Sequence, residues 1–257
     1  MTKSLIGENF SKSACSYDRH CCVQAECAQR LLDLTEGGDF RRILEIGCGT
    51  GNFTRLLRRK YLGAEITAVD ISGQMIESAK KKLDGDKLRF FVADGEKLSI
   101  ERAFDLVTAN ASLQWLDQPE VSFGRFARFL DDGGVISFSI YGPETFTELE
   151  SVLSKRLGKG KWLSSRMFTS PDLIRRSVEK HFESVEFEEA RFTVVFSSLI
   201  DLLRDIKRSG VRGYGLGGRA YLGRQLLAAL EKDYLDKYGC IIASHQVFFC
   251  KGVKKLS

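Results

Sequence analysis

Short apolar runs alternate with segments of helical periodicity over the first 140 residues of the chain. Apolar runs of strand length occupy residues 41–48, 64–70, 87–94, 103–110 and 133–140. The segments 52–62, 72–83 and 119–130 between them place apolar residues at helical spacing, and Ser72 is positioned as the N-cap of the second. This alternation predicts βαβ units and a parallel sheet that is covered by helices on both faces.

The pattern changes after residue 140. We predict a mostly helical stretch with a basic loop in its middle, then a strand, two helices that each end at a glycine, and a last strand. These segments are residues 143–181 with the loop 155–168, 185–196, 197–210, 219–239 and 244–254. The second half therefore supplies two strands and helical insertions, which we expect to form a lid.

The whole chain is expected to be one α/β domain, because α/β folds often exceed 200 residues. In this reading residues 1–40 are N-terminal lid helices, residues 41–140 are a cofactor-binding core, and residues 141–257 hold the insertions and the last two strands.

Three glycines follow the first strand at every second position, in the stretch LEIGCGTGNFT: Gly47, Gly49 and Gly51. Dinucleotide folds favour G-x-G-x-x-G, and phosphate-binding loops need Lys and then Ser or Thr after the last glycine. The chain has neither pattern. Glu45 precedes the turn, where a carboxylate opposes a pyrophosphate and favours a cationic ligand. Cys48 lies within the turn, where a small side chain suffices.

Acidic residues end the next two predicted strands. Asp70 stands nineteen residues after the last glycine of the turn, where a carboxylate accepts hydrogen bonds from both ribose hydroxyls. Asp94 is placed to meet the amino group of adenine, with Gly95 leaving room for the ring and Ile71 and Met75 as candidates to sandwich it. These features describe a ligand with ribose, adenine and a positive charge but no phosphate. S-adenosylmethionine fits this description, and NAD is the alternative.

The spacing of these acids and glycines on successive strand ends resembles the class I methyltransferases that use S-adenosylmethionine. The resemblance covers residues 41–140. It implies a Rossmann-like fold with a seven-stranded, mostly parallel sheet whose last strand is antiparallel.

Composition indicates a globular protein and bears on its cellular compartment. With 43% hydrophobic and 28% charged residues, the chain is typical of globular proteins. No apolar stretch is long enough to cross a bilayer, and the first twenty residues lack the apolar core of a signal peptide. We therefore expect a cytosolic protein with no membrane partner. The seven cysteines include no pair of C-x-x-C elements, so we expect small buried residues and no metal site.

Positive charge is concentrated in the second half of the chain. The net charge is +5, but residues 1–140 carry 19 basic against 20 acidic residues, whereas residues 141–257 carry 20 against 14. This excess indicates an acidic partner, with an ordinary solvated surface as the alternative.

The fourth strand runs into TANASLQWLDQPE, which lacks the Asn/Asp-Pro-Pro-aromatic motif of enzymes that methylate adenine or glutamine amides. Asn110 and Gln114 are candidates to line the cofactor or acceptor site. Trp115 either walls the same pocket or packs in the core. None of the three histidines falls at a strand end that faces the expected site. An acceptor that is already ionised, such as a carboxylate, needs no general base and is therefore favoured.

Four segments resemble the malonyl-[acyl-carrier protein] O-methyltransferases of biotin synthesis: SYDRHCCVQAECAQRLL, NASLQWLDQ, ISFSIYGPETFTEL and LLRDIKRSGVRG. The resemblance implies methylation of the free carboxylate of a malonyl thioester, which is then elongated toward pimelate. It implies that Tyr17 is a lid tyrosine over the acceptor, although packing of a helix is its alternative role, and that Tyr141 shapes the same pocket. The closing HQVFF departs at His245 from the YHVLF that is usual in the family, a change expected to affect packing more than chemistry.

The acyl-carrier protein implied by this resemblance is acidic, which suits the basic second half. Basic residues gather in 155–176 and 204–224, and Arg204, Lys207 and Arg208 lie on adjoining faces of one predicted helix. A small-molecule methyltransferase of the trans-aconitate type and an RNA methyltransferase or non-catalytic cofactor-binding module are the alternatives. Few aromatic residues lie among the basic ones, which disfavours nucleic acid.

Overall fold

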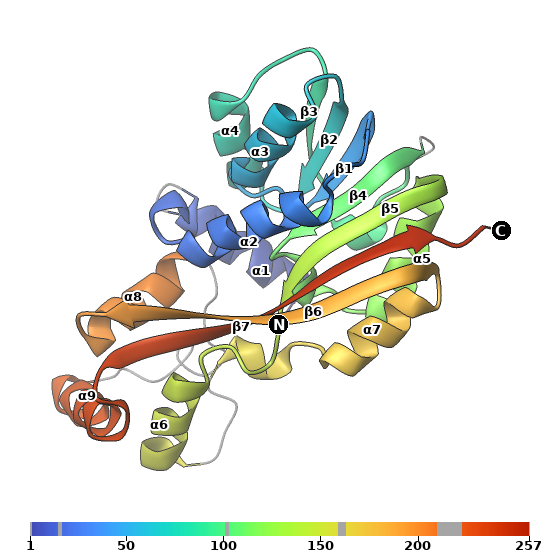
Figure 1. The fold of residues 1–257 in the computed structure, drawn as a ribbon. Helices are drawn as coiled ribbons and strands as arrows, with labels where there is room; N and C mark the ends of the chain where they lie inside the picture. Colours follow the sequence, from blue (N-terminus) through green and yellow to red (C-terminus); the bar gives the residue numbers. More distant parts are fainter. Residues whose placement is uncertain (1, 15–16, 101–102, 159–162, 210–222, 257) are drawn as a thin grey trace.

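The computed structural model describes residues 2–14, 17–100, 103–158, 163–209 and 223–256. They form one seven-stranded sheet in the order β3-β2-β1-β4-β5-β7-β6 (Figure 1). The strands are β1 (Arg42–Ile46), β2 (Glu65–Asp70), β3 (Leu88–Val92), β4 (Phe104–Asn110), β5 (Leu130–Tyr141), β6 (Phe182–Phe196) and β7 (Ile241–Lys254). The first five are parallel, and β7 runs antiparallel to both of its neighbours. The predicted fold class is thereby confirmed.

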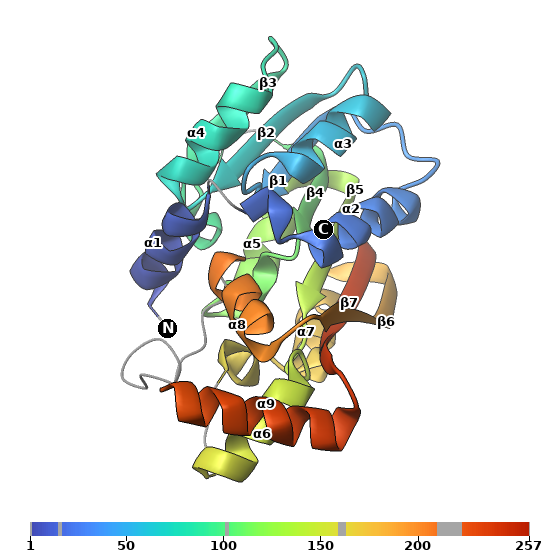
Figure 2. The same cartoon turned by 90° about the vertical axis from the view of Figure 1, so that its left-hand side faces the viewer.

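Helices cover both faces of this sheet, as the alternation of the sequence predicts. On one face lie α2 (Cys22–Leu34), α3 (Asn52–Lys60) and α4 (Gly73–Lys82), and on the other lie α5 (Pro119–Phe129) and α7 (Pro171–Glu179) (Figures 1 and 2). Successive strand residues point to opposite faces. Accordingly Ile43 packs in the cluster under α2 and α3, whereas Leu44 packs in the cluster under α5.

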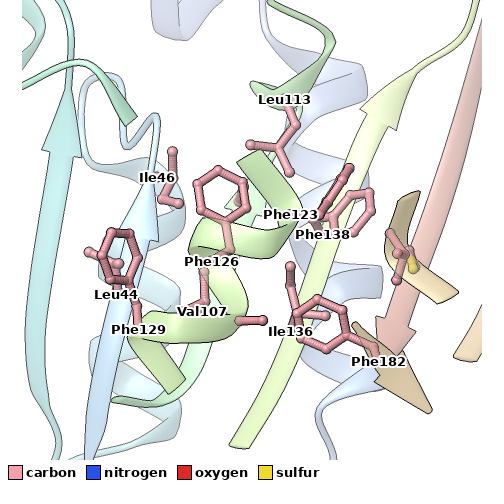
Figure 3. Close-up of a cluster of buried hydrophobic side chains, with 14 of the residues drawn as sticks. Leu44, Ile46, Val107, Leu113, Phe123, Phe126, Phe129, Ile136, Phe138 and Phe182 are labelled. Atoms are coloured by element: carbon pink, nitrogen blue, oxygen red, sulfur yellow. The ribbon is translucent and has the colours of Figure 1, made fainter. Parts of the chain in front are cut away.

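The aromatic face of α5 anchors the centre of the sheet. Phe123, Phe126 and Phe129 recur every third position and point from the helix toward β1, β4 and β5 (Figure 3). All three rings are buried, and Phe123 lies 5.2 Å from Phe138 of β5 between ring centroids. Each such ring contributes about 1.5–3 kcal/mol by leaving water. This packing fixes the strands whose carboxyl ends carry the polar residues singled out above.

The helical insertions lie at the outer end of β6 and β7. Helices α6 (Thr147–Leu157), α8 (Leu199–Arg208) and α9 (Arg224–Tyr238) share a separate apolar cluster with Ile241 and Ala243 of β7 (Figure 2). As predicted, α9 ends at a glycine, Gly239, whose φ is +73°. The glycine expected at the end of the preceding helix lies outside the described residues, as do residues 219–222.

The cysteines only partly match the expectation of small buried residues. Cys21, Cys27, Cys48 and Cys250 are buried, but Cys22 and Cys240 are exposed, and all six are free thiols. The expectation of burial thus fails for Cys22 and Cys240. Cys15 lies outside the described residues. Across the described part of the chain, no helix has the length and apolarity needed to span a membrane.

Candidate active site

A pocket opens at the carboxyl ends of β1 to β4, where the strand order reverses between β1 and β4. Open α/β sheets bind their ligands at this kind of switch point. The space between the atoms of this pocket is about 770 Å³, part of it open to solvent. The sequence-predicted residues that line it are Tyr17, Gly47, Gly49, Asp70, Ile71, Met75, Asp94, Gly95, Asn110 and Trp115.

The glycine turn follows β1 and has the backbone that its sequence requires. Gly47 has a φ of +75°, and a Cβ at this position would lie 2.3 Å from the Cβ of Ser112. Gly49 has a φ of +54°, and a Cβ there would meet no atom within 4 Å. The first glycine thus allows two loops to approach each other, and the second leaves space free for a ligand. Gly51 instead packs toward Leu83 and does not line the pocket.

Asp70 ties the glycine turn to the start of α4. Its carboxylate accepts hydrogen bonds from the backbone N–H of Gly49 at 2.9 Å and from that of Ser72 at 2.8 Å. Burial raises the pKa of Asp70, and the two backbone hydrogen bonds oppose this shift. Each carboxylate oxygen retains a further lone pair. Asp70 can therefore accept hydrogen bonds from a ligand without leaving its present position, and Ser72 caps α4 as predicted by accepting from Met75.

Asp94 binds a cation from the N-terminal helix α1 (Lys3–Ser13). The Lys3 ammonium donates to Asp94 Oδ1 at 2.7 Å and also contacts Glu96. Burial would raise the pKa of Glu96, but hydrogen bonds from the Asp117 backbone and from Lys3 lower it to about 2. The Lys3 N–H group therefore stands where an adenine amino group is expected to donate. Gly95 packs closely here, since a Cβ would lie 2.6 Å from Ile46 Cγ2.

Glu45 lies behind the glycine turn and not on the surface of the pocket. Its side chain is 1% exposed, and its Oε2 has no hydrogen-bond partner among the described residues. Burial raises the pKa of Glu45 to about 8, and the nearby charge of Asp70 adds to this effect. Glu45 and Cys48 are both buried, and neither lines the main pocket in the structure.

Tyr17 and Trp115 both line the main pocket and form one wall of it. Tyr17 belongs to a 3-10 turn, η1 (Tyr17–Arg19), and Phe10 of α1 contacts the rings of both. Burial raises the pKa of Tyr17 above its ordinary value, so the hydroxyl remains protonated, and it is hydrogen-bonded with the Gln24 side chain. The Nε1 of Trp115 is buried and has no partner among the described residues. Two of the residues that line the main pocket, Tyr17 and Trp115, therefore carry hydrogen-bond donors.

A second, smaller cavity, called here the side cavity, lies on the other side of this wall. It encloses about 400 Å³, including its opening, and its lining includes His20, Gln24, Tyr141, Phe168 and His245. Tyr141 thus lines the side cavity and not the main pocket. Gln114 lines neither cavity, because it is buried with its Nε2 donating to the Ala111 carbonyl at 2.8 Å.

The three basic residues predicted on one helix lie on α8. Arg204, Lys207 and Arg208 are exposed, do not line the main pocket, and lie on the helix that borders the side cavity. Arg204 pairs with Asp201 at 2.5 Å. Several other basic residues of the second half are also paired, since Lys155 and Arg156 contact Asp233 and Arg175 contacts Glu179. Lys159, Lys161, Arg212 and Arg219 lie outside the described residues.

Helix α1 closes the main pocket through residues that the sequence did not single out. Lys3, Ile6 and Phe10 line the pocket and recur every three or four positions on one face of the helix. Of the described residues of the helical insertions, none lines the main pocket, whereas several line the side cavity. Helix α1 of the N-terminal segment thus covers the main pocket. Ala111, at the end of β4, also lines the pocket with a φ of +50°, a strained conformation of the kind found at functional sites.

Comparison with known proteins gives a family and a fold. Residues 44–138 match the family model described as methyltransferase domain. The chain is 34% identical over 239 residues to malonyl-[acyl-carrier protein] O-methyltransferase 1 of Ilyobacter polytropus, with 92% of this chain and 88% of the relative covered.

Solved structures share the architecture at lower identity. The YcgJ protein of Bacillus subtilis superposes with a TM-score of 0.62 and 16% identity, covering 90% of this chain and 99% of that chain. Phosphoethanolamine N-methyltransferase 2 of Haemonchus contortus in complex with S-adenosyl-L-methionine gives a TM-score of 0.58 and 19% identity over 89% of this chain. The chain spans about half of the Haemonchus enzyme, 52% of its length. Both likenesses concern the fold.

Proposed function

The chain belongs to the malonyl-[acyl-carrier protein] O-methyltransferases, and we propose that it methylates the free carboxylate of a malonyl thioester carried by an acyl-carrier protein. The methyl donor is S-adenosylmethionine, and the product is the malonyl methyl ester that starts pimeloyl and biotin synthesis. The observation that carries the proposal is the main pocket, where Asp70 and Asp94 flank a glycine turn that leaves open space beside Gly49.

The residues of the pocket suit an adenosyl sulfonium. In this proposal Asp70 accepts hydrogen bonds from the ribose hydroxyls, and Asp94 accepts from the adenine amino group in place of Lys3. Ile71 and Met75 contact the base, while the bare backbone of the turn adjoins the methionine part. Glu45, Cys48 and Gly51 support the turn from behind, and Asn110 holds the end of β4. When bound, the cofactor supplies an electrophilic methyl group on a sulfonium.

The acceptor side needs positioning more than proton transfer. A malonyl carboxylate is ionised at neutral pH, so no general base is required. The Tyr17 hydroxyl and the unpartnered Nε1 of Trp115 are donors that can orient it. Ile6 and Phe10 exclude water from the same end. Holding the carboxylate at near-attack distance lowers the barrier by up to about 7–11 kcal/mol.

An acyl-carrier protein is the partner that this function requires. We propose that Arg204, Lys207 and Arg208 on α8 steer this acidic protein, because all three are exposed on one short helix. In this view the chain works as one domain, with residues 41–140 holding the cofactor and residues 1–40 and 141–257 holding the acceptor. Salt screens such steering. Activity on malonyl-carrier protein should therefore fall as salt rises, whereas activity on a small malonyl thioester should barely respond.

A methyl-transfer assay with four acceptors tests the proposal. The acceptors are malonyl-carrier protein, malonyl-coenzyme A, free dicarboxylates including trans-aconitate, and RNA. The proposal requires that one of the two malonyl thioesters is methylated fastest. Transfer confined to trans-aconitate or to RNA would replace it with the corresponding alternative function.

A further inference from the structure

The side cavity shares its wall with the main pocket but opens from it toward α8. Gln24 lines the side cavity and bonds the hydroxyl of Tyr17, which lines the main pocket. Phe168 lines the side cavity and packs edge-on against Trp115 of the main pocket, with ring centroids 5.2 Å apart. A chain that enters through the side cavity would thus place its end next to the residues proposed to orient the acceptor.

The lining of the side cavity suits an uncharged polar chain. Phe146, Phe168 and Val194 supply apolar walls, and Tyr141 and Thr145 add neutral hydroxyls. No lysine or arginine lines it among the described residues, and its acid, Asp205, is paired with His20 at 2.6 Å between Oδ1 and Nδ1. A free carboxylate would therefore find no free cation within the side cavity.

One buried polar atom in the side cavity lacks a partner. His245 is 9% exposed, and its Nδ1 has no hydrogen bond within the described part of the chain. Burial lowers the pKa of His245 to about 4, although backbone hydrogen bonds oppose the shift, so the ring is neutral at pH 7. A neutral imidazole nitrogen either accepts from an N–H or donates to a carbonyl, depending on its tautomer. A buried polar atom of this kind is stabilised by a partner from a ligand.

The lining of the side cavity reaches the basic end of α8 through Asp205 and Ser209. The pair between His20 and Asp205 joins the N-terminal segment to α8, and Arg208 Nη1 lies 3.4 Å from His20 Nε2. Lys207 is exposed on the same turn. This arrangement, with basic residues next to the side cavity and neutral groups lining it, suits a ligand chain that has an anionic end near α8 and a neutral thioester end within the cavity.

We propose that the side cavity binds the thioester-to-amide end of a pantetheine-type arm and that His245 hydrogen-bonds the amide nearest the sulfur. This inference rests on the proposed function, because that function supplies an acyl group on such an arm. His245 then affects the binding and positioning of the acceptor and leaves the binding of the cofactor unchanged. The side cavity is specific for the carrier arm, while the malonyl carboxylate passes the wall into the main pocket.

Two small substrates that differ in this amide test its contribution to recognition. Malonyl-N-acetylcysteamine retains the thioester and the first amide of the arm, whereas the S-ethyl malonyl thioester ends before that amide. We expect the wild-type protein to favour the first by about three- to tenfold in kcat/KM, the effect of one neutral hydrogen bond. The variant His245→Phe should lose this preference, keep its rate with the S-ethyl thioester, and bind S-adenosylmethionine as before by calorimetry.

A second pair of variants tests the site without touching the histidine. Val194 lines the side cavity, whereas Val195, the next residue of β6, is 69% exposed and does not line it. Val194→Phe should raise the KM for malonyl-N-acetylcysteamine about tenfold or more by filling the side cavity, while Val195→Phe should leave it unchanged. The inference is overturned if the wild type shows no preference, if His245→Phe retains it, or if the two valine variants behave alike. Absence of methyl transfer to any malonyl thioester would instead overturn the proposed function.

Discussion

Replacing Asp70 by alanine tests how the pocket recognises its cofactor. In the structure the carboxylate accepts from the backbone N–H of Gly49 and from that of Ser72, and it faces the main pocket with lone pairs to spare. Asp70→Ala therefore removes two internal hydrogen bonds and the acceptor proposed for the ribose hydroxyls. The two effects separate, because the first acts on folding and the second on binding.

The magnitudes follow from the numbers of hydrogen bonds. A hydrogen bond to a charged group contributes about 1.5–3 kcal/mol, so two ribose contacts amount to about 3–6 kcal/mol. Since about 1.4 kcal/mol corresponds to tenfold in affinity, we expect S-adenosylmethionine to bind at least about a hundredfold more weakly. Each of the two backbone N–H groups left without an acceptor should lower the free energy of unfolding by about 1–3 kcal/mol.

Calorimetric titration with S-adenosylmethionine measures the loss, and Ser72→Ala is the matched control. Ser72 lies at the same helix start and caps α4 through its hydroxyl, but it does not line the main pocket. Its loss should cost about 1 kcal/mol of stability and leave the affinity nearly unchanged. If Asp70→Ala binds the cofactor as tightly as the wild type, Asp70 does not hold the ribose and the assignment of the pocket fails.

Three further variants probe other parts of the site. Tyr17→Phe should lower kcat about tenfold to a hundredfold through the loss of one hydrogen bond to a carboxylate while cofactor affinity stays constant, and equal turnover would leave Tyr17 a packing residue. Gly47→Ala should lower the free energy of unfolding, measured with urea, by about 2–5 kcal/mol, because the new Cβ would lie 2.3 Å from Ser112 Cβ and the φ of +75° is unfavourable for alanine. Gly63→Ala is the control and should change the stability little, because a Cβ there meets nothing within 4 Å. The ligand-free protein should lose stability between about pH 4.5 and pH 8, since the folded state keeps a proton on Glu45, with a pKa of about 8, that the unfolded state releases. Glu45→Gln should remove that part of the pH dependence, and an unchanged profile would show that Glu45 is ionised in the fold.

Sequence patterns were sufficient for the sheet and for its polar strand ends. Each predicted strand overlaps an observed one: the apolar runs of β1 and β4 reflect burial on both faces of the sheet, and the alternation of β6 reflects burial on one face. Asp70, Asp94, Gly47 and Gly49 line one pocket because parallel strands bring their carboxyl ends to the same edge. These features depend on local spacing, which the sequence displays directly.

The parts that were missed depend on contacts between distant segments. Lys3 meets Asp94 across 91 residues, and nothing in the spacing of α1 indicates this ion pair. His245 lies next to Tyr141 and Phe146 and lines the side cavity, a position that depends on the pairing of β7 with β5 and not on local spacing. In the basic second half, Lys155 and Arg156 both contact the single carboxylate of Asp233, an arrangement that composition does not reveal.

Intact-mass spectrometry of malonyl-carrier protein after incubation with the protein and S-adenosylmethionine tests the central claim most directly. The account predicts that the carrier gains the mass of one methyl group in place of one hydrogen, with an equal amount of S-adenosylhomocysteine formed. A carrier of unchanged mass, together with binding of NAD in place of S-adenosylmethionine, would contradict it.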